Sequence, residues 1–214
     1  MNWHRDTGPG SKRGYHHGNL REALIKAALD LISQKGPAGF TFAEAARAAG
    51  VSAAAPYRHY RDRDALLADV ARRGYELFEA SLAKAWNGGE PDPHTAFHAL
   101  GRAYLSFAKR EPAYFAAMFE AGLAFTEFPE LRDAGDRAFG ILREACAALI
   151  GTLAAEKRPP VMMMALHVWS LSHGIAALFA RGDGARRSIP MPPEDLLEAA
   201  ILVYLDGLGL EARK

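Results

Sequence analysis

Residues 41–52, which read TFAEAARAAGVS, decide the fold. Thr41 followed three residues later by Glu44 is the capping-box pattern that begins a helix, and the alanines after it allow a second helix to cross closely. Gly50 supplies the backbone conformation that a sharp turn needs, and Ser52 is the expected N-cap of the next helix. The pattern predicts a helix-turn-helix, although the spacing alone also fits a generic pair of antiparallel helices.

Helical periodicity extends outward from this stretch over almost the whole chain. Apolar residues from Leu20 to Ile32 recur at the i, i+3, i+4, i+7 spacing of an amphipathic helix, with Asn19 as its expected N-cap and Gly36-Pro37 at its end. Strand patterns are essentially absent. Further helices are expected near residues 62–87, 93–110, 112–122, 130–156, 159–181 and 193–209. The sequence therefore predicts an all-α fold of about nine helices: an N-terminal three-helix helix-turn-helix domain and a C-terminal helical bundle.

Charge and composition narrow the functional class. Residues 1–61 carry nine Lys and Arg against four Asp and Glu, whereas the rest of the chain carries 17 against 21. A basic N-terminal region on a mildly acidic body favours a polyanion as the partner. We expect a flexible basic arm (1–14), a helix-turn-helix DNA-binding domain (15–61) and a helical effector-binding and dimerisation domain (62–214). One cysteine and no apolar signal segment favour the cytoplasm.

Residues 18–66 resemble the DNA-binding domain of the tetracycline-repressor (TetR) family. The likeness lies in the stretch that begins at Thr41 and in residues 57–66, YRHYRDRDAL, where the family has Tyr-x-His-Phe, two basic positions and a Leu. Tyr60 stands where the family has Phe, and we expect it to pack inward. The resemblance implies a sequence-specific DNA-binding transcriptional regulator, and our leading hypothesis is a repressor that a small-molecule effector releases from DNA.

The resemblance also implies roles for residues of the recognition helix and of the helix that follows. Tyr57 and Arg63 would contact phosphates, which fixes the register on DNA without reading sequence. Arg58 and His59 would contact base edges or phosphates, since an Arg can bridge two acceptors of guanine. These four residues are the central candidates for DNA contact.

Three further residues are candidate DNA contacts. Thr41 and Ser52 would cap helices whose N-termini point at phosphates. His17 would reach the DNA backbone or minor groove from the arm, with a solvated tail as the alternative. Pro56 departs from the expected pattern, because it falls inside the recognition helix and cannot donate a backbone hydrogen bond. Alanines precede it, so specificity is expected to depend on Arg58, on methyl contacts and on DNA shape.

The C-terminal body carries a second resemblance. Residues 167–174, HVWSLSHG, resemble a variant TetR C-terminal domain with a Trp-x-x-x-His-Gly (WHG) pattern. The family implies a pocket for a small effector, although the same aromatic side chains fit ordinary core packing. Few acidic or basic residues fall in these apolar stripes, so an apolar or weakly polar effector is expected. The candidate pocket residues are Tyr104, Phe107, Phe115, Met118, Phe119, Trp169 and His173.

The resemblance further implies a homodimer formed by the last two helices. An apolar stripe on the last helix gives the candidate interface residues Leu197, Ala200, Ile201 and Tyr204. Two copies would present their recognition helices to a palindromic operator on double-stranded DNA. Residues 159–180 carry no charged side chain and are long enough to cross a membrane, but burial between the body and a second subunit explains them better, so no membrane partner is expected.

Catalytic and metal-binding patterns are weak. His94 and His98 lie at i, i+4, but the Glu that follows the first His in helical zinc hydrolases is missing. A Gly-x-Ser-x-Gly nucleophile elbow is also missing. We therefore expect no enzyme activity, no cofactor and no metal. The alternative to a regulator is a small-molecule binding protein whose DNA-binding domain is vestigial.

Overall fold

The computed structural model describes residues 20–180 and 189–210, and this part of the chain is helical, with no strand. The α-helices are α1 (Leu20–Lys35), α2 (Phe42–Ala48), α3 (Arg63–Trp86), α4 (Pro93–Arg110), α5 (Pro112–Phe119), α6 (Pro129–Gly151), α7 (Val161–Ala180) and α9 (Pro193–Gly207). Three short 3-10 helices are η1 (Ala55–Arg58), η2 (Asn87–Gly89) and η3 (Ala155–Lys157). The predicted all-α fold is confirmed. Asn19, His17 and the arm lie outside the described residues.

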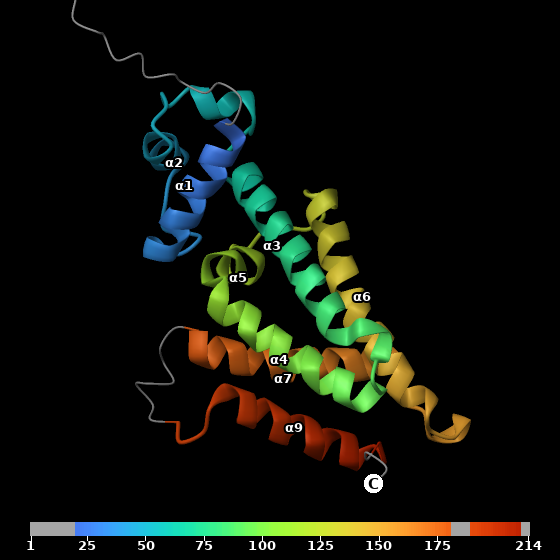
Figure 1. The fold of residues 1–214 in the computed structure, drawn as a ribbon. Helices are drawn as coiled ribbons and strands as arrows, with labels where there is room; N and C mark the ends of the chain where they lie inside the picture. The colour runs from blue at the N-terminus through green and yellow to red at the C-terminus, as the bar shows by residue number, and fades with distance from the viewer. Residues whose placement is uncertain (1–19, 181–188, 211–214) are drawn as a thin grey trace, which may run out of the picture.

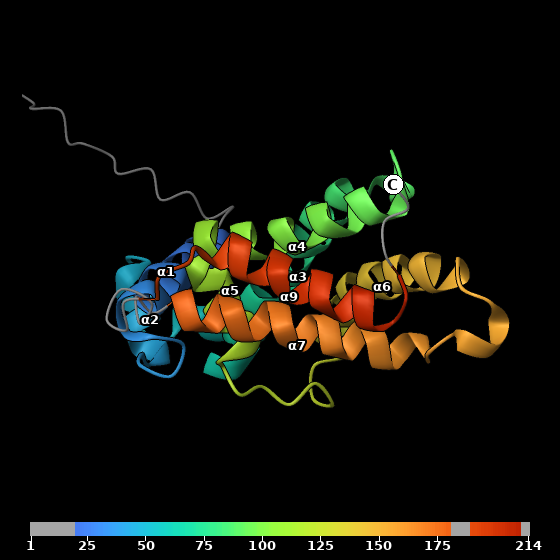
Figure 2. The same ribbon diagram turned by 90° about the horizontal axis from the view of Figure 1, so that it is seen from below.

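The helices form a small N-terminal group and a larger body. Helices α1, α2 and η1 lie together at one end, and α3 leaves this end and runs along the body beside α6 (Figure 1). Helix α5 lies between α1 and the far part of the body, where α4 crosses α3. Helices α7 and α9 lie side by side on the outside, as the view from below shows (Figure 2). The long helix α3 therefore joins the N-terminal group to the body.

Helix α2 begins and ends as the sequence predicts. The Thr41 hydroxyl accepts from the Glu44 amide at 3.2 Å, and the Glu44 carboxylate accepts from the Thr41 amide at 2.7 Å, which completes the capping box. Helix α2 ends in a Schellman motif, because Gly50 has φ 72° and the Val51 amide donates to the Ala46 carbonyl at 3.0 Å. The start of α2 and the sharp turn after it follow from these local contacts.

The recognition element is shorter than predicted. Instead of a helix capped by Ser52, residues 55–58 form the single 3-10 turn η1, which has no side-chain cap. Pro56 is the cause: its ring would clash with the Ser52 carbonyl in an α-helix, and a proline also disfavours the helical conformation for Ala55. The Ser52 carbonyl accepts from the Ala55 amide at 3.0 Å instead. The predicted Ser52 cap is therefore wrong.

Two body helices end earlier than the predicted segments. Helix α5 stops at Phe119, and Gly122 with φ 68° turns the chain away. Helix α6 stops at Gly151 rather than near 156, and the Arg158 guanidinium donates to the carbonyl of Gly151 (3.1 Å) and to that of Leu153 just beyond the helix (2.9 Å). The sequence pattern located both helices but missed these local stops.

Glycine and cysteine positions show how tightly the body is packed. A Cβ atom at Gly74 of α3 would meet the Met118 sulfur of α5 at 2.8 Å, so Gly74 allows α5 to lie against α3. Gly101 of α4 similarly faces Leu197 and Ile201 of α9. Cys146 is fully buried, and burial raises the pKa of its thiol to about 12. Its thiol is accordingly protonated at neutral pH, and it packs as a small core residue.

Candidate DNA-binding surface and effector cavity

The short turn η1 presents polar side chains outward. Tyr57 is 63% exposed, and its ring rests edge-on against Phe42 of α2 with the centroids 5.1 Å apart. Arg58 and His59 are also exposed, and neither forms an ion pair with a described residue. Pro56 is fully buried beneath them and fixes the turn to the domain core. The three candidate contacts of this turn therefore share one accessible element.

Arg63, the other predicted phosphate contact, is engaged within the protein. Its Nε donates to the Phe40 carbonyl at 2.8 Å, another nitrogen donates to the Pro37 carbonyl, and the guanidinium lies 5.0 Å from the centre of the Phe40 ring. It also pairs with Asp64 at 3.1 Å. These contacts fasten the α1–α2 connection to the start of α3. Its phosphate contact stays a prediction.

The start of α2 carries a negative charge of its own. Lys35 lies 2.8 Å from the Glu44 carboxylate, and this contact together with the Thr41 hydrogen bonds lowers the pKa of Glu44 to about 2. Glu44 is therefore ionised at neutral pH beside Thr41. A phosphate approaching Thr41 would meet this carboxylate. Ser52 is exposed on the turn before η1, and contact of either residue with DNA stays a prediction.

One basic residue of this domain was missed by the sequence reasoning. Arg47 lies in the last turn of α2, it is exposed, and it makes no ion pair with a described residue. Its helix buries Ala45 and Ala46, so the periodicity places Arg47 outside the core. The signal that sequence reasoning missed was a positively charged residue on the outer face of the helix next to the recognition turn.

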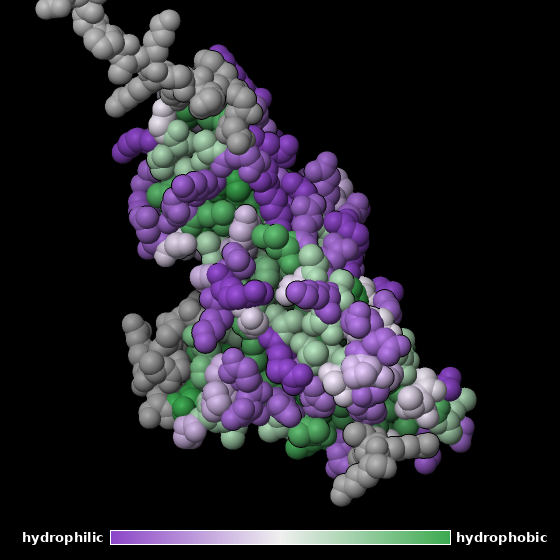
Figure 3. Space-filling model, in the orientation of Figure 1, coloured by the Kyte–Doolittle hydropathy of each residue, from purple (hydrophilic) through white to green (hydrophobic). Residues whose placement is uncertain are grey.

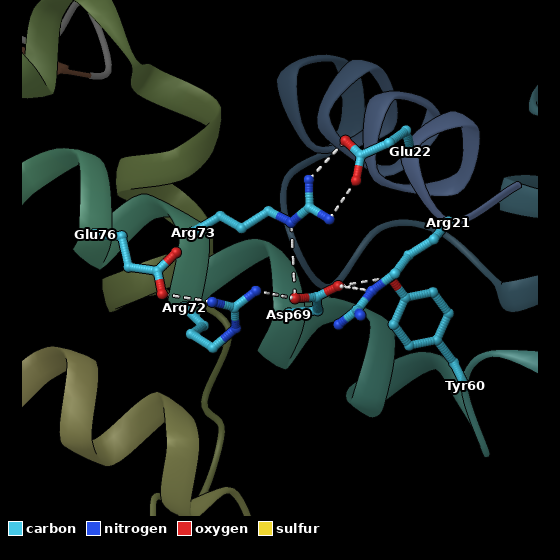
Figure 4. A network of polar contacts seen from close by, with 7 residues as sticks. All are labelled: Arg21, Glu22, Tyr60, Asp69, Arg72, Arg73 and Glu76. Carbon is cyan, nitrogen blue, oxygen red and sulfur yellow. Dashed lines mark hydrogen bonds and ion pairs between the residues drawn. The ribbon is translucent and has the colours of Figure 1, made fainter. Parts of the chain in front are cut away.

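A network of charged residues centred on Asp69 joins the DNA-binding domain to α3 (Figure 4). Asp69 is 6% exposed and accepts hydrogen bonds from the Tyr60 hydroxyl (2.6 Å), from Arg21 of α1 (2.9 Å) and from Arg72 (2.7 Å). Burial acts to raise the pKa of Asp69, but these three hydrogen bonds lower it to about 2. The hydroxyl that distinguishes Tyr60 from the family's Phe is thus one of the donors to this buried carboxylate.

The second part of the network crosses from α3 to α1 through Arg73. Two of its nitrogens bind the two oxygens of Glu22, one at 2.7 Å, while its buried Nε has no hydrogen bond to a described residue and lies 3.7 Å from Asp69. Bonding to Glu22 raises the pKa of Arg73, and it lowers the pKa of Glu22. The network therefore fixes the angle between α1 and α3.

The body contains a cavity of about 240 Å³ between α3, α4, α6 and α7. Three of the predicted pocket residues line it: Tyr104, Phe119 and Trp169. Exposed lining residues on α6, on α7 and on the loop before α6 mark its opening. The full lining is Tyr75, Phe78, Leu82, Phe97, Leu100, Gly101, Tyr104, Phe119, Phe125, Gly135, Asp136, Ala138, Phe139, Leu142, Leu166, Val168, Trp169, Ser172 and Ile201.

Four of the predicted pocket residues, His173, Phe115, Phe107 and Met118, lie behind the cavity wall rather than in it. His173 Nδ1 is 3.0 Å from the Tyr104 hydroxyl, and its ring stacks on Phe115 at 5.6 Å. Burial lowers the pKa of His173, which keeps its ring neutral at pH 7. Phe107 packs on the Phe78 ring with the centroids 5.0 Å apart, and Met118 packs against Gly74 of α3. These four residues support the wall and do not line the cavity.

The outer face formed by α7 and α9 is apolar and exposed. Val203 of α9 is 75% exposed, Leu202 is 52% exposed, and Met162 of α7 is 48% exposed. Apolar side chains reach the surface at the lower end of the molecule, where α9 lies (Figure 3). On α7, a Cβ atom at Gly174 would meet nothing within 4 Å, so no described helix of this chain covers that glycine.

The predicted interface stripe needs correction. Leu197 (2% exposed) and Ile201 (1% exposed) pack under α4 against Gly101, so a second subunit cannot reach them. Ala200 is half-buried, and so is Tyr204, whose hydroxyl is 3.0 Å from His167 Nδ1 on α7. The stripe read from the sequence was the face that α9 buries inside its own subunit. The exposed apolar residues Leu202 and Val203 lie on the neighbouring face of α9.

Helix α7 includes one segment, Val161–Phe179, that is long and apolar enough to cross a membrane, and it is the only such helix in the described ranges. About a third of that segment is buried within the body. One helix of this kind is weak evidence for a membrane span, because a core helix passes the same test. A helix with one face in its own subunit and another against a second subunit has the same composition.

Comparison with known proteins matches both parts of the chain. Residues 24–70 match the family model of bacterial regulatory proteins of the tetR family, and residues 97–204 match a tetracyclin repressor-like C-terminal domain, which includes the Trp-x-x-x-His-Gly segment. The HTH-type transcriptional regulator YobS of Bacillus subtilis (strain 168), itself uncharacterized, is 25% identical over 198 residues, which are 89% of this chain and 93% of YobS.

Solved structures share the fold over nearly the whole chain. A protein of unknown function from Rhodococcus sp. RHA1 is 31% identical, with a TM-score of 0.73 over 92% of this chain and 98% of that one. The TetR family transcriptional regulator PfmR from Thermus thermophilus is 20% identical, with a TM-score of 0.64 over 89% and 99%. The helix-turn-helix, the helical body and both family matches agree, so this chain belongs to the TetR family of DNA-binding transcriptional regulators.

Proposed function

We propose that this regulator is a homodimeric repressor, acting in the cytoplasm, that leaves a palindromic operator when a small molecule fills the body cavity. One observation carries the release step. The loop between α5 and α6 contributes Phe125 to the cavity, and Glu127 and Phe128 of the same loop contact Arg61 beside the recognition turn. Cavity and DNA-binding domain thus share one segment of chain.

The contacts of this loop suggest how occupancy is transmitted. The Arg61 guanidinium lies 3.6 Å from the Glu127 carboxylate and 5.5 Å from the centre of the Phe128 ring. A ligand that displaces Phe125 pulls on residues only two and three positions away. Arg61 directly precedes Asp62, the N-cap of α3, so its movement changes how the DNA-binding domain sits on α3. Coupling of this kind requires that the effector binds the two arrangements with different affinities.

For the DNA contacts, we propose that Tyr57 and His59 anchor the recognition turn, that Arg58 reads a base edge, and that Thr41, Ser52, Arg63 and the arm residue His17 assist. The exposure of Tyr57, Arg58 and His59 supports this assignment. A recognition element of four residues offers few side chains to a major groove, so sequence-dependent DNA shape is expected to carry part of the specificity.

A duplex selected from a random pool by the full-length protein tests this function. At about 150 mM salt, where non-specific contacts are weak, we expect recovery of a palindromic motif. The double variant Tyr57→Ala/Arg58→Ala should bind the selected duplex about a hundredfold more weakly, because each lost contact is worth about 1–3 kcal/mol. Fluorescence anisotropy with a labelled duplex gives the affinities.

The matched control for this experiment is Arg102→Ala. It removes a positive charge from the exposed surface of α4, away from the recognition turn, and should change the affinity less than twofold. If the double variant binds the duplex as tightly as the control, the recognition turn does not read DNA. The alternative of a small-molecule binding protein with a vestigial DNA-binding domain would then be favoured.

A further inference from the structure

Aromatic rings dominate the walls of the cavity. Eight of its nineteen lining residues are aromatic, among them Tyr75 on α3, Phe119 on α5 and Trp169 on α7, so rings from different helices surround the same space. The faces of aromatic rings carry negative electrostatic potential and attract cations as well as flat apolar groups. The volume of about 240 Å³ exceeds the roughly 150 Å³ of a cavity that admits benzene. A molecule somewhat larger than benzene is the appropriate size.

The charged side chain in the lining is a carboxylate. Asp136 of α6 is exposed and forms no ion pair with a described residue. Its neighbours on the same helix differ in this respect, because Asp133 pairs with Arg132 at 3.3 Å and Arg137 pairs with Glu79 at 3.0 Å. Neither of these two pairs lines the cavity. An unpaired negative charge therefore stands at the opening of a space walled by rings.

Ser172 of α7 gives the cavity a second polar group. The residue is 3% exposed, it belongs to the lining, and its hydroxyl makes no hydrogen bond with a described residue. A ligand that carries a hydrogen-bonding group would find a donor and an acceptor in this hydroxyl.

The other titratable groups near the cavity do not oppose a cation. Burial raises the pKa of Tyr75 to about 12 and also raises the pKa of Tyr104, so both phenols are neutral at pH 7. His173, which binds the Tyr104 hydroxyl, is kept neutral by burial, as described above. Among the described residues that line the cavity there is no lysine or arginine. An anionic ligand would find no positive partner in this described lining, whereas a cation would find one negative partner and several ring faces.

We propose that the effector is a lipophilic cation: an aromatic or alkyl-aromatic amine whose ammonium group meets Asp136 while its apolar part lies among the rings. This inference rests on the proposed function in that it names the ligand class of the same cavity. It narrows the earlier expectation of an apolar or weakly polar effector by assigning a charge to one end. Asp136 acts as the residue that selects for charge, and the rings supply most of the contact area.

Three probes with a common body separate charge from apolar binding: 4-phenylbutylamine, which is protonated at pH 7, the neutral 4-phenylbutanol and the anionic 4-phenylbutanoate. Isothermal titration calorimetry on the full-length protein should show the ammonium binding roughly five- to tenfold more tightly than the alcohol, with the carboxylate weakest. In Asp136→Asn the ammonium and the alcohol should bind about equally. In the matched control Asp133→Asn, on the same helix but outside the cavity, the preference should persist.

Equal binding of the three probes to the wild type, failure of all three to bind at millimolar concentration, or an unchanged preference in Asp136→Asn would each overturn the proposal. Release of the selected DNA duplex is measured in parallel with the same probes. An ammonium that binds through Asp136 but leaves DNA affinity unchanged would support the ligand class and contradict effector release. The two proposals therefore fail separately.

Discussion

Replacing Asp69 by alanine is expected to lower the free energy of unfolding by about 3–5 kcal/mol, because it removes the acceptor from a buried charged network. The Tyr60 hydroxyl and the guanidinium groups of Arg21 and Arg72 all donate to this one carboxylate. Arg72 and Arg73 are largely shielded from water and would lose a negative neighbour. Urea unfolding followed by circular dichroism measures the loss.

Graded variants separate the charge from the contacts. Asp69→Asn keeps the shape and some hydrogen bonds, so its loss should be smaller than that of Asp69→Ala. Tyr60→Phe introduces the residue that the family has at this position and should cost about 1 kcal/mol for one hydrogen bond. Asp133→Ala, at an exposed site on α6, should stay within about 0.5 kcal/mol of the wild type. A loss below about 1 kcal/mol in Asp69→Ala would show that the network contributes little to stability.

The same carboxylate makes the free energy of unfolding fall at low pH. The pKa of Asp69 is about 2 in the folded chain against an ordinary value of 3.8, so the unfolded chain binds the proton more readily. The stabilisation is therefore complete above about pH 4–5 and is lost as the pH falls towards 2. It amounts to about 2 kcal/mol. In Asp69→Asn the free energy of unfolding should change less between pH 5 and pH 2 than in the wild type. An equal loss in both proteins would show that Asp69 is not the group responsible.

The network also bears on function, because it joins the element that reads DNA to the helix that runs through the body. Tyr60 follows the recognition turn, Arg21 and Glu22 belong to α1, and the remaining partners belong to α3. Arg61, which contacts the α5–α6 loop, lies next to Tyr60 in the sequence. Charged contacts hold Tyr60, α1 and the start of α3 together. A shift of that loop would therefore move the DNA-binding domain as one unit.

Local signals in the sequence were sufficient for much of the fold. The capping box at Thr41 and the turn at Gly50 each involve residues within a few positions, and the structure contains both. Periodicity located the body helices for the same reason, since a helix of several turns shows its buried face repeatedly. Turn chemistry and helix caps are encoded locally, which makes them predictable from one sequence.

Features that depend on contacts between distant residues could not be predicted from the sequence pattern. The Asp69 carboxylate receives donors from residues 9 and 48 positions away, and no spacing rule connects them. The apolar stripe of α9 was predicted to be an interface with a second copy, because periodicity cannot tell a face buried by α4 from one buried by another subunit. Pro56 was noticed, yet its consequence, a 3-10 turn in place of a recognition helix, required knowing which conformation the neighbouring contacts would support.

Dissociation of the dimer by Val203→Glu is the second large effect that we expect. Val203 is 75% exposed on the outer face of α9, next to Leu202. Helix α9 lies beside α7, where a Cβ atom at Gly174 would meet nothing within 4 Å among the described residues. Since a two-fold interface brings the same patch from both subunits together, one substitution places two carboxylates in it. The dimer dissociation constant should rise at least a hundredfold, or about 2.7 kcal/mol. Sedimentation equilibrium measures it.

Leu77→Glu is the matched control for this substitution. Leu77 is a 48% exposed apolar residue on α3, away from α7 and α9, so the same exchange there should leave the dimer intact. Loss of the dimer should carry loss of binding to the palindromic duplex, because a single recognition turn makes only half of the contacts. If Val203→Glu stays as dimeric as Leu77→Glu, the exposed α7–α9 face is not the interface, and its apolar surface requires another partner.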